Sequence, residues 1–168
     1  MEKYLKSLPK EIQDLIYVPS DIAGENKMPA YLVGGFVRDL ILGIKNLDLD
    51  ITVEGDGIKF AQCFAAATKS KLICHRRFGT ATLALRHNLK TDIATARSET
   101  YPYPASLPVV TPGSIKEDLC RRDFTINAMA MSINKHNFGS LIDIFAGQDD
   151  LRHKRIRVLH DLSFIDDP

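Results

Sequence analysis

The sequence lacks the marks of secreted, zinc-binding and membrane proteins. Its 168 residues include three cysteines, Cys63, Cys74 and Cys120, none in a CxxC spacing. This excludes a disulfide framework and a zinc site. No stretch approaches the ~18 apolar residues that cross a bilayer, and the N-terminus lacks the apolar run of a signal peptide. We therefore expect a soluble, cytoplasmic protein with no membrane partner.

An excess of charge is also missing, since the net charge is +1. Nucleic-acid-binding domains are often strongly basic, so any contact with RNA must come from local clusters. The two dense basic runs are residues 75–77 and 152–155. Each is either a solvated surface or a contact for RNA phosphates. With 45% apolar and 26% charged residues, the chain has the composition of an ordinary globular domain.

Helical and strand periodicities alternate along the chain and predict an α/β (α+β) fold, with a mixed sheet of about five strands flanked by helices. Helices are expected at residues 8–18, 36–42, 58–67, 115–131 and 148–153. Strands are expected at residues 30–33, 46–53, 71–74, 80–85, 90–94 and 140–144. Four prolines predict a long loop at residues 97–112.

The strand expected at residues 46–53 carries the first chemical signal, Asp48-Leu49-Asp50. Alternation places both carboxylates on one face, roughly 7 Å apart. Two like charges at this distance favour a cation between them, and Mg²⁺ is bound by a few carboxylates together with substrate phosphates. The alternative is the solvated face of an edge strand.

The second signal is Gly34-Gly35 between an expected strand and an expected helix, followed by Arg38 and Asp39. Glycines at such a turn let backbone amides approach an anion at the helix N-terminus. Arg38 could grip phosphate oxygens while Asp39 holds it. The alternative is a tight turn with a surface ion pair. A phosphate cradle followed within about a dozen residues by a metal-binding strand is a complete layout for nucleotidyl transfer.

Three motifs together resemble the signature of class II tRNA nucleotidyltransferases and bacterial poly(A) polymerases, of the polymerase-β-like superfamily. They are Gly34-Gly35-Phe36-Val37-Arg38-Asp39, Asp48-Leu49-Asp50 and Arg121-Arg122-Asp123-Phe124-Thr125-Ile126-Asn127-Ala128. The resemblance runs from about residue 31 to the end of the chain, and the eight-residue string is highly specific.

The resemblance implies a polymerase-β-like nucleotidyltransferase head and a role for each motif. It makes Asp48 and Asp50 catalytic Mg²⁺ ligands, and Asp92 either a third catalytic carboxylate or a strand-end residue exposed to water. The residues implied in nucleotide binding are Gly34, Gly35, Arg38, Arg121, Arg122, Asp123 and Asn127. Near the last group, we expect Glu117–Arg121 and Asp118–Arg122 to pair across one helical turn.

The implied reaction is transfer of AMP or CMP from ATP or CTP to the 3′ hydroxyl of tRNA, with release of pyrophosphate. Addition of CCA, of CC, of A alone and of poly(A) all remain open. Two alternatives are a non-catalytic nucleotide- or RNA-binding module, and transfer to a small molecule, which would not require the eight-residue string.

The resemblance also predicts how the chain is divided. Residues 1–145 would form the head and residues 146–168 the start of a neck. The base-selecting neck motif and the parts that hold tRNA would lie beyond the chain, so we expect little activity from it alone. The loop at residues 97–112 resembles one that positions the reacting ends; the alternative is a mobile surface loop.

Overall fold

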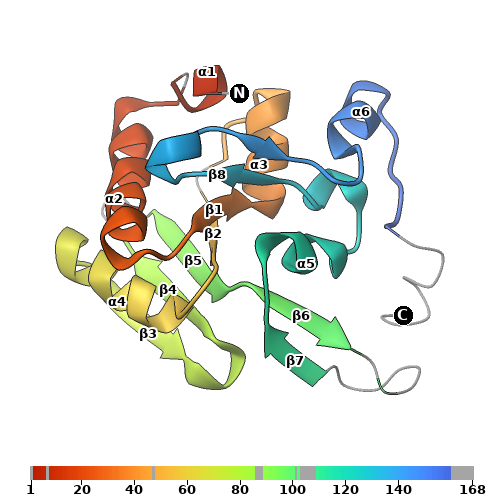
Figure 1. Cartoon of the computed structure of the whole chain (residues 1–168). Coiled ribbons are helices and arrows are strands. Elements are labelled where there is room, and N and C mark those ends of the chain that lie inside the picture. The colour runs from red at the N-terminus through yellow and green to blue at the C-terminus, as the bar shows by residue number, and fades with distance from the viewer. Residues whose placement is uncertain are drawn as a thin grey trace.

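A mixed sheet runs through the centre of the molecule (Figure 1). The computed structural model describes residues 2–6, 8–46, 48–85, 89–100, 102 and 109–159. Among these residues the sheet has seven strands in the order β3-β4-β5-β2-β1-β8-β9. Strands β2 and β5 pair in parallel, and the other neighbours pair antiparallel. The prediction of a mixed sheet flanked by helices is confirmed, with more strands than the five expected.

The strands of this sheet are β1 (Ala30–Val33), β2 (Asp48–Val53), β3 (Lys71–His75), β4 (Thr80–Ala84), β5 (Lys90–Thr95), β8 (Ala130–Ser132) and β9 (Leu141–Ile142). A two-stranded sheet pairs β6 (Arg97–Thr100) with β7 (Val109–Pro112). The helices are α1 (Glu2–Lys6), α2 (Lys10–Asn26), α3 (Gly34–Leu42), α4 (Gly57–Thr68), α5 (Ile115–Cys120) and α6 (Gly147–Arg152). Short 3₁₀ turns are η1 (Arg76–Phe78), η3 (Thr125–Asn127) and η4 (Lys135–Asn137).

The two faces of the large sheet are covered differently. On one face, α2 and α4 bury alternate strand residues such as Ile51, Leu83 and Ile93 in the main core. On the other face, α5 packs over β1 and β8 in a smaller cluster that includes Tyr31 and Leu119. The rest of this second face, over β2, β5, β4 and β3, is only partly buried. One sheet face is therefore half covered and half open.

The helix predicted at residues 115–131 is wrong beyond Cys120. There the chain leaves the helix, turns through η3, and enters β8. The Asp123 carboxylate accepts a hydrogen bond from the Phe124 amide at 2.7 Å, a local contact that competes with helix formation. Residues 128–134 are all buried, as in a strand covered on both faces, so burial does not separate helix from strand.

Two further predictions need correction. The expected loop at residues 97–112 begins and ends in the paired strands β6 and β7, while residues 101 and 103–108 lie outside the described part. The helix expected at residues 8–18 is longer than predicted, since α2 runs from Lys10 to Asn26 and ends at Lys27 in the left-handed conformation. No helix in the described part of the chain is long and apolar enough to span a membrane.

Candidate active site

The three sequence motifs meet at Gly34, where β1 runs into α3. Gly34 has φ +64°, which strains any residue with a side chain. A Cβ atom here would lie 2.9 Å from Nη1 of Arg122 and 3.9 Å from Oδ2 of Asp50. The glycine turn, the Asp-Leu-Asp strand and the arginine pair are therefore within contact distance of one point, although they are far apart in sequence.

The parallel pairing of β2 with β5 sets Asp50 directly beside Asp92 and Asp48 beside Lys90. Burial is the first cause that raises the pKa of Asp50, and the neighbouring carboxylates of Asp92 and Asp48 raise it further, although Arg122 opposes them. The fold thus brings three carboxylates together, and a bound cation would relieve their repulsion. This arrangement fits a divalent metal ion.

Within the described residues, no group of three or more histidine, cysteine or carboxylate side chains is placed to hold a metal ion. The structure therefore offers two carboxylates, Asp48 and Asp50, whose remaining partners would be substrate phosphates. Mg²⁺ is commonly bound in this way.

Asp92 is held by polar contacts that the sequence did not reveal. Its Oδ1 accepts a hydrogen bond from the Thr82 hydroxyl at 2.5 Å, and its Oδ2 pairs with Lys90 at 2.6 Å. The hydrogen bond to Asp92 raises the pKa of Lys90. Asp92 is thus a half-buried neighbour of Asp50, and its role as a catalytic carboxylate remains a prediction.

Arg38 is oriented from two sides. Its Nε donates to Oδ1 of Asp39 at 2.8 Å, as the sequence predicted. Its Nη1 donates to Oδ1 of Asn127 at 2.8 Å, which joins α3 to the third motif. Asn46 holds the other oxygen of Asp39 at 2.8 Å. The guanidinium is therefore fixed beside the glycine turn before any ligand binds.

Asp118 orients the two arginines of the third motif. Its side chain is fully buried, and it accepts from Nη2 of Arg122 at 3.0 Å and from Nη2 of Arg121 at 2.8 Å. The predicted pairing of Asp118 with Arg122 is confirmed. Arg121 also reaches Glu99 on β6 at 3.5 Å, so its contacts lead toward the hairpin. Arg122 faces Asp50, and its Nε is buried without an acceptor in the described part.

Asp123 and Asn127 lie close together, but not on a helix as predicted. They belong to the turn around η3, where Nδ2 of Asn127 lies 3.5 Å from Oδ1 of Asp123. Asp123 is exposed, whereas Asn127 is half-buried against Arg38. The turn, rather than a helical repeat, brings them together.

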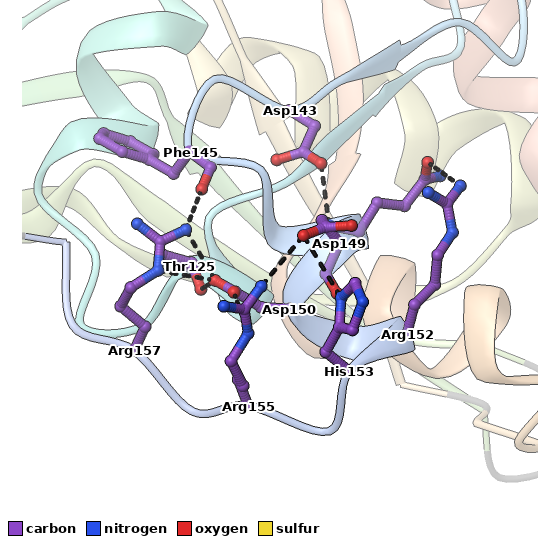
Figure 2. Close-up of polar contacts among 10 residues, drawn as sticks. Thr125, Asp143, Phe145, Asp149, Asp150, Arg152, His153, Arg155 and Arg157 are labelled. Atoms are coloured by element: carbon purple, nitrogen blue, oxygen red, sulfur yellow. Dashed lines mark hydrogen bonds and ion pairs between the residues drawn. The ribbon is translucent and has the colours of Figure 1, made fainter.

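A buried carboxylate on α6 anchors this turn from behind (Figure 2). Asp150 accepts from the Thr125 hydroxyl at 2.7 Å and from Nε of Arg157 at 3.0 Å. The Thr125 hydrogen bond is the first cause that lowers the pKa of Asp150. At Gly147, a Cβ atom would clash with the carbonyl oxygen of Thr125. No sequence spacing pointed to this contact between segments 25 residues apart.

Comparison with known proteins identifies the arrangement. Residues 30–157 match the family described as the Poly A polymerase head domain. The chain belongs to this family. The matched residues contain all three motifs, and they extend past the predicted boundary at residue 145, a division that remains a prediction.

Individual relatives of this head domain carry nucleotidyltransferase names. The A-adding tRNA nucleotidyltransferase of Geobacter sulfurreducens is 46% identical over 163 residues, which cover 97% of this chain and 18% of that protein. A CCA-adding enzyme in an apo form superposes with a TM-score of 0.94 at 48% identity, over 99% of this chain and 40% of that one. The Thermotoga maritima CCA-adding enzyme complexed with tRNA gives 0.85 at 47% identity, over 99% and 37% of the two chains.

The chain spans less than half the length of each of these relatives. Its fold is nevertheless matched over nearly its whole length, so the predicted polymerase-β-like head and the family resemblance are confirmed.

Proposed function

We propose that the chain is the catalytic head of a template-independent RNA nucleotidyltransferase. It transfers AMP or CMP from ATP or CTP to the 3′ hydroxyl of tRNA and releases pyrophosphate. The observation that carries the proposal is the meeting of Gly34, Asp50 and Arg122 at one point, because a phosphate bound at the glycine turn would then lie beside a carboxylate that can hold a cation. The names of the relatives support tRNA as the substrate.

In this proposal the nucleotide triphosphate lies against the glycine turn. Gly34 and Gly35 open the nine-residue helix α3, whose N-terminus favours an anion. Arg38 and Arg122 supply guanidinium groups for phosphate oxygens. Asp123 and Asn127 would contact the ribose from the turn around η3, and Arg121 would contact the phosphates at the edge of the nucleotide site.

Asp48 and Asp50 would hold Mg²⁺, with Asp92 beside them. When bound, the ion would neutralise phosphate charge and lower the pKa of the attacking hydroxyl. The hydroxyl oxygen forms the new bond to the α-phosphorus, the bond to pyrophosphate breaks, and the hydroxyl proton passes to solvent. The protein contributes mainly by positioning the reactants and by fixed charge.

Further parts of the proposal concern organisation and location. Residues 1–145 form the head and residues 146–168 begin a neck, and most contacts with tRNA lie outside the chain. Residues 160–168, in the proposed neck segment, lie outside the described residues. A cytoplasmic location is supported by the three cysteines, all of which are free.

The test is incorporation of labelled ATP or CTP by the intact protein into tRNAs ending before CCA, after C and after CC, with Mg²⁺ present. Asp48→Ala/Asp50→Ala should lower the rate at least about 10²-fold. Asp14→Ala, which removes an exposed carboxylate on α2, is the matched control. The products distinguish CCA, CC, A-only and poly(A) addition. Nucleotide binding without any incorporation by the wild type would instead indicate a non-catalytic binding module.

A further inference from the structure

An open strip of sheet face leads from the carboxylates to the edge strand β3. Residues paired directly across β2, β5, β4 and β3 point to the same face. One such row, here called the carboxylate row, consists of Asp50, Asp92, Thr82 and Ile73. The next, here called the lysine row, consists of Asp48, Lys90, Ala84 and Lys71.

The strip is accessible and nearly flat between its ends. Thr82 is half-buried and Ala84 is exposed, and neither side chain rises far above the sheet. At the edge, Ile73 is 61% exposed and Lys71 is exposed. The opposite side of the same strands is core, packed against α4. An extended segment could therefore lie across these strands without displacing any described helix.

The nucleotide cradle lies on the other side of Asp50. Gly34 stands at the end of β1, which borders β2 on the side away from β5. In phosphoryl transfer, the attacking and leaving oxygens are roughly in line on opposite sides of the phosphorus. With the triphosphate held on the β1 side, the attacking hydroxyl must approach from the β5 side, over the strip.

The β3 end of the strip suits a polyanion, whereas its other end carries the carboxylates of Asp48, Asp50 and Asp92. Lys90 and Lys71 stand in the lysine row, beyond the negative charge of Asp48. Nζ of Lys90 already forms an ion pair with Oδ2 of Asp92 at 2.6 Å. No hydrogen bond or ion pair of Lys71 is seen within the described part of the chain. Grooves for single-stranded nucleic acid combine such positive charge with surfaces for the bases.

We propose that the 3′-terminal segment of the RNA acceptor binds along this strip. Lys71 contacts a backbone phosphate, and the face of Ile73 supports a base next to the reacting end. This inference rests on the proposed function and names the surface that receives its second substrate.

The experiment compares Lys71→Glu and Ile73→Ala with wild type in the intact protein. The KM for a tRNA lacking its terminal nucleotides is measured at saturating nucleotide, and the nucleotide KM at saturating tRNA. Lys71→Glu should raise the tRNA KM by about 3–10-fold and leave the nucleotide KM unchanged, because only a phosphate contact is lost. Lys71→Ala should lower the salt slope of tRNA binding by about 1. Ile73→Ala should raise the same KM by a smaller factor.

Two matched controls lie away from the strip. Lys59→Glu changes an exposed lysine on α4, at the covered face, and Ile156→Ala changes an isoleucine that is 75% exposed. Both should keep the wild-type KM values. A wild-type tRNA KM and salt slope in Lys71→Ala and Lys71→Glu, in a protein that adds nucleotides, would overturn this inference alone. A wild-type protein that adds none would overturn the proposed function and the inference with it.

Discussion

Asp118 is the side chain whose removal should disturb both the fold and the nucleotide site. It is fully buried and accepts hydrogen bonds from Arg121 and Arg122, as well as one from the Arg97 amide at 3.4 Å. The side chains of Arg121 and Arg122 are only 23% and 18% exposed. Asp118→Ala would therefore leave two arginines largely buried without their shared carboxylate.

Removing one partner of a buried ion pair costs about 3–5 kcal/mol, because the remaining charge is desolvated and unpaired. Arg121 would keep a second carboxylate, since Glu99 lies 3.5 Å from it. The uncompensated charge is therefore mainly that of Arg122, which favours the lower end, about 3 kcal/mol. For a domain of this size each kcal/mol shifts the Tm by about 2–4 °C, so the Tm should fall by about 6–12 °C.

Thermal denaturation of residues 1–168, followed by circular dichroism, measures this change. Asp14→Ala, which breaks the exposed ion pair with Lys10, should leave the Tm almost unchanged. In the intact protein, Asp118→Asn should raise the KM for nucleotide, because Arg122 loses the charge that orients it. A Tm of Asp118→Ala within about 2 °C of wild type would correspond to a loss of less than about 1 kcal/mol in the free energy of unfolding. That result would refute the assignment of Asp118 as the anchor of both arginines.

Two further predictions concern other carboxylates. Without divalent cations, Asp50→Asn should have a higher Tm than wild type at neutral pH, because burial and then the charge of Asp92 raise the pKa of Asp50 and disfavour its carboxylate. Mg²⁺ at about 100 times its Kd should stabilise the wild type by about 2.7 kcal/mol and the variant much less; equal Mg²⁺ shifts in a thermal titration would contradict this. Asp150 behaves in the opposite sense, because the Thr125 hydrogen bond lowers its pKa. The stabilising contribution of the Asp150 carboxylate is present above the ordinary pKa of aspartate and is lost as the pH falls through the lowered pKa of Asp150. The free energies of unfolding in urea of wild type and Asp150→Asn should therefore converge at acid pH. A difference between them that stays constant down to the acid range would contradict this prediction.

Much of the site could be predicted from the sequence because its signals are local. Alternation placed Asp48 and Asp50 on one face of a strand, and the structure has that strand. The glycine pair predicted a strand-to-helix turn, and Gly34 takes positive φ there. Asp118 and Arg122, one helical turn apart, pair as expected. In each case the spacing of a regular element fixes the geometry.

The remainder depends on contacts between distant segments. Asp92 lies beside Asp50 because β5 is the strand that pairs with β2. The register of a parallel pair cannot be predicted from the sequence of either strand alone. Thr82 became a partner of Asp92 through the same register. The helix predicted after Cys120 was wrong because the buried residues there suit a strand equally well. The strand is selected by its pairing with β1 and by the contact between Asp150 and Thr125.

The half-covered sheet face explains why these residues gather where they do. Asp50 lies on the border between the part of the face under α5 and the open strip over β5 and β4. On the covered side, burial strengthens the field of Arg122 and disfavours an unpaired carboxylate, which favours binding of a cation. On the open side, a second substrate can approach without moving a helix. If an added helix or a bulky side chain at Ala84 closed the strip while the covered side stayed intact, nucleotide binding should survive and transfer to RNA should fail. The border position therefore accounts for both substrates of the proposed reaction.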